Sequence, residues 1–123
     1  MINGNQNQVT GNQNNVQKDN NKVAGSQNNV DGNNNTLIGD KNNIQGDLNI
    51  AKGDLNTING SQNILSGDLN LIQGNKNAVG GNENTVKGSE NTVIGDQNFL
   101  LNSNKNQVNG SRNTIKNGDN NFV

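Results

Sequence analysis

The chain repeats every seven residues over residues 4–123, and this period restricts the possible folds more than any other feature. The 17 units align on the pattern G-[DNS]-x-N-x-[VIL]-x, and the fourth position is Asn in every unit. The sixth position is Val, Ile or Leu in 16 units and Ala51 in the other. Gly occupies the first position in 15 units, and Lys18 and Ser103 replace it in the remaining two. A fixed period of this kind predicts one small structural unit stacked on copies of itself.

The composition alone is typical of a disordered chain, because only 26% of the residues are hydrophobic and Trp, Tyr and Pro are absent. The repeat argues against disorder, since a disordered chain has no reason to carry an aliphatic residue at every seventh position. The chain has no Cys for a disulfide framework and no His, the commonest general base and metal ligand. We therefore predict a single ordered domain, residues 1–123, with no catalytic residues, no metal and no cofactor.

The pattern within each unit predicts a strand and a corner rather than a helix. A coiled coil needs two apolar positions in seven, whereas each unit has one dependable apolar position, a Gly and several Asn. In N-x-[VIL]-x the Asn and the aliphatic residue alternate with two variable residues, as on the two faces of a strand. The Gly-[Asp/Asn/Ser] pair favours a turn, because Gly accepts positive φ and the short polar side chain bonds nearby backbone. Lys18 should cost about 1 kcal/mol if its corner needs positive φ.

Two such strands placed back to back make one coil. We predict an all-β fold, a parallel β-solenoid (β-roll) of about eight coils of 14–15 residues, with two flat parallel sheets and Val, Ile and Leu inside. The steps from Gly95 to Ser103 and from Gly110 to Gly118 are eight residues long, which predicts one extra residue at each of those corners. The small Ala51 should leave a weak point in the core.

The invariant Asn is predicted to point inward beside the core. When it is stacked on copies of itself, each amide donates to one neighbour and accepts from the other, as amides do in cross-β stacks. A buried amide is tolerated when both ends are hydrogen-bonded, and a charged Asp would disturb the stack. The predicted Asn ladder consists of Asn7, Asn14, Asn21, Asn28, Asn35, Asn42, Asn49, Asn56, Asn63, Asn70, Asn77, Asn84, Asn91, Asn98, Asn106, Asn113 and Asn121.

Alternate units lie on opposite sheets, so the outward residues divide into two faces. One face is predicted to be flatter and less polar through its middle, and the other carries mostly amides and long charged side chains. Small side chains with methyl and hydroxyl groups, about 4.8 Å apart on a rigid sheet, suit the binding of ice-like water with little loss of entropy. The alternative is a face that only keeps the rod soluble. The candidate ice-binding residues are Thr10, Ala24, Thr36, Ile38, Ile50, Ile64, Ser66, Ala78, Thr92 and Ile94.

Residues 26–32 (SQNNVDG) and 89–95 (SENTVIG) resemble the xxNxVxG repeat of the ryegrass-type antifreeze family, and the resemblance covers nearly the whole chain. It implies a left-handed β-roll that binds ice through one flat sheet, and it favours an extracellular protein, although the start MINGNQNQV has no apolar segment of a signal peptide. The family's ice face is rich in Thr, Ser and Val, whereas this chain has six Thr and many outward Asn and Gln.

Other kinds of site have less support in the sequence. Calcium-binding repeats keep Asp at fixed positions, whereas the G-D-x-N units here use Asn or Ser freely in place of Asp. Gly80-Gly81 lacks the strand–helix context of a phosphate loop, and no nucleophile has a partner base. The sequence has neither the basic patch nor the stacking aromatic residues of a nucleic-acid-binding protein. No apolar stretch is long enough to span a membrane. We therefore predict neither an enzyme nor a protein that binds nucleic acid or membranes.

The sequence leaves two functions open. We predict an ice-binding protein that adsorbs to ice or ordered water through the less polar face and inhibits ice growth or recrystallisation. The alternative is a non-catalytic structural solenoid that assembles end to end into fibres or a surface coat, because no Pro or charged strand blunts the sheet edges at Ile2-Asn3-Gly4 and Phe122-Val123. A homo-oligomer of this chain would form through end-to-end or face-to-face contacts.

Overall fold

The computed structural model describes all 123 residues and contains 17 short strands and no helix. Apart from β1, each strand covers the fifth to seventh positions of one unit, as the alternation predicts. The odd-numbered strands are β1 (Ile2–Asn3), β3 (Asn15–Gln17), β5 (Asn29–Asp31), β7 (Asn43–Gln45), β9 (Thr57–Asn59), β11 (Leu71–Gln73), β13 (Thr85–Lys87), β15 (Phe99–Leu101) and β17 (Thr114–Lys116). The even-numbered strands are β2 (Gln8–Thr10), β4 (Lys22–Ala24), β6 (Thr36–Ile38), β8 (Ile50–Lys52), β10 (Ile64–Ser66), β12 (Ala78–Gly80), β14 (Thr92–Ile94) and β16 (Gln107–Asn109).

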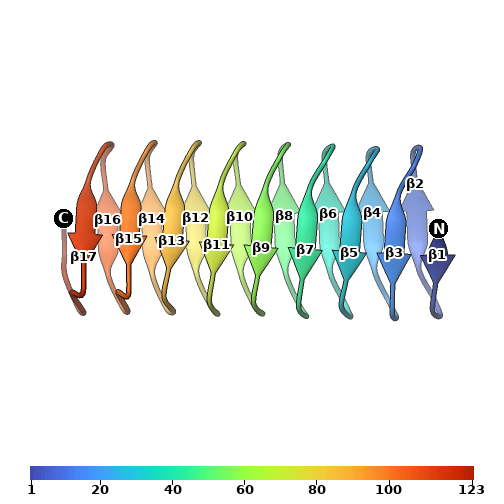
Figure 1. Cartoon of the computed structure of the whole chain (residues 1–123), viewed down its shortest axis with the longest axis horizontal. Helices are drawn as coiled ribbons and strands as arrows, with labels where there is room; N and C mark the ends of the chain where they lie inside the picture. Colours follow the sequence, from blue (N-terminus) through green and yellow to red (C-terminus); the bar gives the residue numbers. More distant parts are fainter.

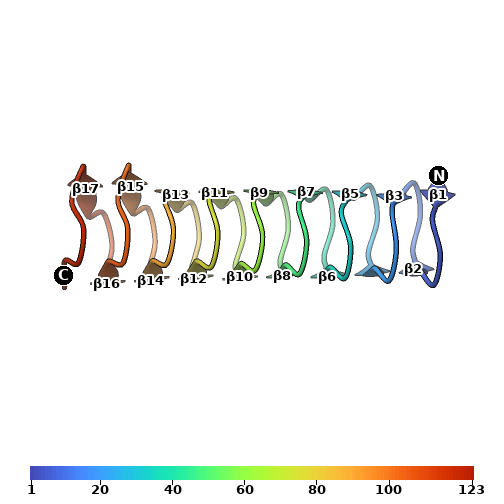
Figure 2. The same ribbon diagram turned by 90° about the horizontal axis from the view of Figure 1, so that it is seen from below.

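The odd-numbered strands form a nine-stranded parallel sheet and the even-numbered strands form an eight-stranded one, so the chain changes sheet after every strand. Paired residues are 14 apart along most of the rod, as Leu71 and Thr85 are, and 15 apart near the C-terminus, as Phe99 and Thr114 are. Figure 2 shows two flat layers with the termini at opposite ends. In Figure 1 the chain advances from right to left, descending in the front sheet and ascending in the rear one, so the coil is left-handed. The predicted all-β parallel solenoid is confirmed.

The core consists of two facing rows of sixth-position side chains, one row from each sheet. Fourteen of them form a single buried cluster that extends from Val16 to Val108, and none is more than 4% exposed. Val9 and Ile115 are partly buried and pack against this cluster. Ala51 is 1% exposed, so it is a smaller side chain within a closed core. The core is therefore thin, and other interactions must hold the coils in register.

The fourth-position Asn residues form two ladders, because each coil contributes one Asn from each of its two units. Asn63 shows the pattern. Its Nδ2 donates to Asn49 Oδ1 at 3.1 Å and to the carbonyl oxygen of Gly74 at 2.9 Å. Its Oδ1 accepts the backbone N–H of Asn77 at 2.9 Å and Asn77 Nδ2 at 3.1 Å. The predicted ladder is confirmed for the buried Asn residues from Asn14 to Asn106, and an amide such as that of Asn63 also bonds two backbone groups of the following coil. Asn7, Asn113 and Asn121, at the ends of the ladders, are less buried.

Gly at the first position meets two requirements at once. Thirteen glycines have φ between 108° and 147°, which side chains rarely allow. The next coil also lies against this position, since a Cβ on Gly60 would stand 1.9 Å from the carbonyl oxygen of Gly74. Lys18 has a φ of 72°, so this corner has the positive φ under which the sequence analysis expects a cost for a residue other than Gly.

The two predicted extra residues are Asn102 and Asn117, which lie in consecutive coils. Each has a φ of 51°, and Asn102 Nδ2 donates to Asn117 Oδ1 at 3.3 Å. Ser103 follows the first of them and is fully buried, with its Oγ donating to the carbonyl oxygen of Leu101 at 2.9 Å. The extra residue takes over the positive φ, which explains why Ser replaces Gly at this corner.

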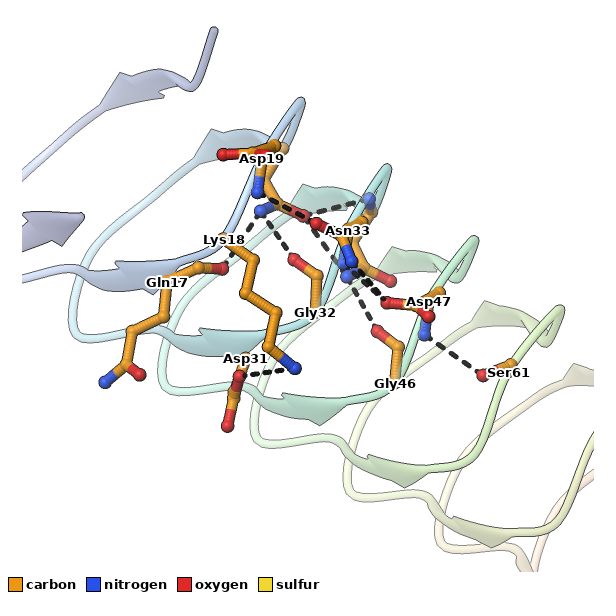
Figure 3. A network of polar contacts seen from close by, with 11 residues as sticks. Gln17, Lys18, Asp19, Asp31, Gly32, Asn33, Gly46, Asp47 and Ser61 are labelled. Carbon is orange, nitrogen blue, oxygen red and sulfur yellow. Dashed lines mark hydrogen bonds and ion pairs between the residues drawn. The ribbon is translucent and has the colours of Figure 1, made fainter. Parts of the chain in front are cut away.

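The second-position side chains link neighbouring coils at the surface. The backbone N–H of Asn33 donates to Asp47 Oδ1 at 2.7 Å, and the N–H of Asp47 donates to Ser61 Oγ at 3.1 Å (Figure 3). The sequence predicts that these side chains bond nearby backbone, and the structure places that backbone in the preceding coil.

We expect Asn63→Asp to destabilise the fold by about 2–4 kcal/mol, because it removes both Nδ2 donors and places a carboxylate in a site that is fully buried. Asn59→Asp is the matched control. Asn59 is exposed on β9 and its side chain makes no hydrogen bond, so the change should cost under about 0.5 kcal/mol. Denaturant unfolding of both variants measures the difference. Equal stability of the two variants would contradict the ladder.

A second pair of variants tests the corners. Gly60→Ala should destabilise by more than about 2 kcal/mol, because its Cβ would overlap the next coil and φ is 147°. Gly80→Ala should be neutral or stabilising by about 0.5–1 kcal/mol, because Gly80 lies in a strand with no atom within 4 Å of the added Cβ. Thermal unfolding of the two variants would contradict this account if Gly80→Ala were the more damaging change.

Candidate functional site

The ten residues predicted to bind ice all lie on the outward face of the eight-stranded sheet. This face has two columns of side chains, because the first and third residues of each strand point outward and the second is buried. The column of first residues is Gln8, Lys22, Thr36, Ile50, Ile64, Ala78, Thr92 and Gln107. The column of third residues is Thr10, Ala24, Ile38, Lys52, Ser66, Gly80, Ile94 and Asn109. The structure therefore brings the predicted set together on one flat surface.

Large aliphatic side chains are exposed in the middle of this face. Ile38, Ile50, Ile64 and Ile94 are between 42% and 57% exposed, with Thr, Ala and Ser among them. Ile50 and Ile64 are neighbours in the column of first residues, and grouped exposed aliphatic side chains mark interaction surfaces more often than single ones do. The only charges on the face are Lys22 and Lys52, and it carries no carboxylate.

The face is not uniform, and two positions interrupt it. Lys52 carries an exposed ammonium group between Ile38 and Ser66 in the column of third residues. Gly80 leaves a depression between Ser66 and Ile94 in the same column, because nothing lies within 4 Å of its missing Cβ. The column of first residues has no such interruption from Thr36 to Thr92.

The opposite face, on the nine-stranded sheet, is chemically different. Its N-terminal half carries an outward amide ladder in which Asn15 Nδ2 donates to Asn29 Oδ1 at 2.8 Å and Asn29 Nδ2 donates to Asn43 Oδ1 at 2.9 Å. Toward the C-terminus this face carries Phe99, with Lys116 Nζ 6.0 Å from the ring centroid. These amides already bond one another, so they offer fewer free groups to a ligand.

The rod has two edges, which we define by the direction of the chain. At the first edge the corners lead from the nine-stranded to the eight-stranded sheet, and at the second edge they lead back. Figure 3 shows part of the first edge, where Lys18 Nζ lies 3.2 Å from Asp31 Oδ1 and the second-position side chains follow one another from coil to coil. Both partners of this ion pair are about half exposed, so it adds little to stability.

Sequence reasoning gave no role to the third position of the units. All 17 third-position residues have φ between 57° and 62°, and their side chains therefore leave the corners in a common direction. Leu48, Leu55 and Leu69 at this position are 49–53% exposed. One signal marks the position in the sequence: it never carries a β-branched residue, the kind that left-handed backbone disfavours most.

The remaining surface offers two hollows, and both are lined only by polar side chains. The hollow at the N-terminal end of the first edge is lined by Gln6, Asn7, Gln8, Asn20, Asn21 and Lys22. The hollow at the second edge is lined by Asn82, Glu83, Asp96, Gln97, Ser111 and Arg112. The structure gathers no group of three or more acidic, His or Cys side chains around a point that could take a metal ion. It also contains no helix long and apolar enough to cross a bilayer.

The chain is similar to a known protein family. A family model described as the grass antifreeze beta roll matches residues 18–104, which include most of the strands of both sheets. The comparison with curated proteins gives no match. The matched region contains every candidate ice-binding residue except Thr10.

Proposed function

The chain belongs to the grass antifreeze β-roll family, and from this premise we propose that it binds ice through the outward face of the eight-stranded sheet and thereby inhibits ice growth or recrystallisation. The observation that carries the proposal is the outward array on that flat face, in which Ile38, Ile50 and Ile64 are exposed. Thr36 and Thr92 are half-buried members of the same array. The family is non-enzymatic, and the proposed partner is ice or ordered water.

The chemistry of the face supports this choice over the opposite face. Methyl groups of Thr, Ile and Ala order the water beside them, and an occasional hydroxyl group hydrogen-bonds to it. Parallel strands set neighbouring side chains of one column about 4.8 Å apart along the rod, and the two columns together give a regular two-dimensional array. Thr and Ile are β-branched and stiff at χ1, so little rotamer freedom is lost when the face docks on a crystal.

The backbone beneath the face is held rigid by the hydrogen bonds already described. Ile64, for example, donates its backbone N–H to the carbonyl oxygen of Asn77, an Asn in the ladder of the first edge. The outward array is therefore fixed by the same contacts that stabilise the fold. End-to-end and face-to-face assembly, the other possibilities raised by the sequence, stay predictions.

We expect the double variant Thr36→Lys/Thr92→Lys to lose ice-crystal shaping and at least about tenfold of its inhibition of recrystallisation, because two long charged side chains would hold the face away from ice. The matched control is Thr57→Lys/Thr85→Lys, which makes the same change at strand-initial Thr residues of the opposite sheet. Crystal morphology and a recrystallisation assay measure both variants. Loss of activity in the control alone would move the site to the nine-stranded sheet.

Lys52→Thr should increase activity about two- to fivefold, because it replaces the ammonium group that interrupts the face and removes the cost of its desolvation. Lys87→Thr is the control, since Lys87 is the third residue of β13 on the opposite face. Dose–response curves for recrystallisation inhibition compare the two variants with the wild type. A fall in the activity of Lys52→Thr would show that the lysine contributes to binding and would contradict this description of the face.

A further inference from the structure

The corners of the second edge, which join each even-numbered strand to the next odd-numbered one, lie along the upper margin of the rod in Figure 1. We call the column of their third-position residues the ridge. All of its members are exposed and have φ between 57° and 62°, so their side chains leave the corners in one direction. By the strand spacing, neighbours on the ridge are about 4.8 Å apart. From the N-terminal to the C-terminal end, the ridge consists of Gln13, Gln27, Lys41, Leu55, Leu69, Glu83, Gln97 and Arg112.

The ridge is self-complementary when a second copy of the chain lies against it in the antiparallel direction. Leu55 then faces Leu69 of a second copy, and Lys41 faces Glu83 of that copy. Continuing outward, Gln27 faces Gln97 and Gln13 faces Arg112. A twofold axis repeats every one of these contacts, so two apolar pairs and two opposite-charge pairs form together, as expected of an isologous interface.

We propose that the second edge is a self-association surface, on which two copies of this chain pack side by side with their rods antiparallel. Leu55 and Leu69 form the apolar centre and the Lys41–Glu83 pairs fix the register. Exposed leucine in left-handed backbone is disfavoured within one molecule, and Asn or Gln serves at the same position of most other corners. Association gives these two side chains a partner that the monomer lacks.

The first edge does not have this arrangement. Its third-position column contains a single leucine, Leu48, with Asn34 and Gln62 on either side. In an antiparallel copy centred on Leu48, that leucine faces only its own equivalent, and Asn34 faces Gln62 on either side, so one apolar pair forms and no opposite-charge pair flanks it. This difference makes Leu48 a control for the effect of an exposed leucine by itself.

Charge on the second edge limits the strength of the contact. The corners of this edge carry five carboxylates, those of Asp40, Asp54, Asp68, Glu83 and Asp96, against the two cations Lys41 and Arg112. The aspartates direct one oxygen to backbone, as when the N–H of Asp54 donates to Asp68 Oδ1 at 2.7 Å. The net repulsion is screened over about 8 Å at physiological ionic strength, whereas the leucine contact is not. We therefore expect a weak dimer, with a Kd of about 0.1–1 mM.

The geometry of the dimer has a consequence for ice binding, which rests on the proposed function. A twofold axis that brings the same edge of two antiparallel rods together must run along the normal of the sheets. Both eight-stranded faces then lie on the same side, next to each other in one plane. The flat area offered to ice doubles, and adsorption raises the local concentration that a weak dimer needs.

The test is a charge-swap cycle measured by sedimentation equilibrium up to about 1 mM protein, so it does not depend on ice activity. We expect Lys41→Glu and Glu83→Lys each to weaken the dimer about tenfold and the double variant Lys41→Glu/Glu83→Lys to restore it. Leu55→Gln/Leu69→Gln should leave a monomer, and Leu48→Gln should associate as the wild type does.

A wild-type chain that stays monomeric over this range would overturn the proposal, and so would a double charge variant no better than the single ones. Circular dichroism of each variant checks that the β-roll is retained. If the dimer forms but Leu55→Gln/Leu69→Gln inhibits recrystallisation as well as the wild type, the self-association surface stands and its link to ice binding falls. If neither the monomeric nor the dimeric forms affect ice, the proposed function fails while the dimer remains.

Discussion

The hydrogen bonding of one side chain, the fourth-position Asn, is the interaction on which the rest of the structure depends. The core has a single aliphatic residue per unit, so burial of apolar surface alone is small for a chain of this length. Each buried Asn joins three consecutive coils, through its own amide and through backbone groups such as the carbonyl oxygen of Gly74. An amide is suited to this role because it donates and accepts at once without carrying charge, so a stack of identical amides is satisfied along its whole length.

The same ladder determines what the surface can do. Because Asn residues stack with their equivalents 14 or 15 residues away, the strands between them stay in register, and outward residues such as Ile50 and Ile64 fall into straight columns. A slip of one residue would turn the outward side chains into the core. The proposed function therefore uses a repeated surface, in which single positions matter by their place in a column. Lys52 and Gly80 illustrate this. Each lies in a regular strand, and each interrupts only the column of outward side chains.

The sequence predicted the architecture in detail because every unit repeats the same local rules. Strand positions, the buried columns and both extra residues, Asn102 and Asn117, follow from spacing alone. The second and third positions were less predictable. The acceptor role of Asp47 depends on the distance between coils, which no single unit encodes. Leu55 and Leu69 are exposed because their backbone is left-handed, and a leucine in the sequence does not predict that conformation. The choice of ice face likewise rests on chemistry summed over a whole sheet.

Exchange of the Asn side-chain amide protons with deuterium, followed by NMR near 0 °C, tests the ladder most directly. The account predicts that the Nδ2 protons of buried Asn residues such as Asn63 and Asn77 exchange only when the coils separate, and therefore at rates that follow global stability. The exposed side chain of Asn59 should exchange at the rate of an unfolded amide. Rapid exchange at Asn63 and Asn77 under conditions where the strand backbone amides remain protected would contradict the claim that these ladders hold the coils together.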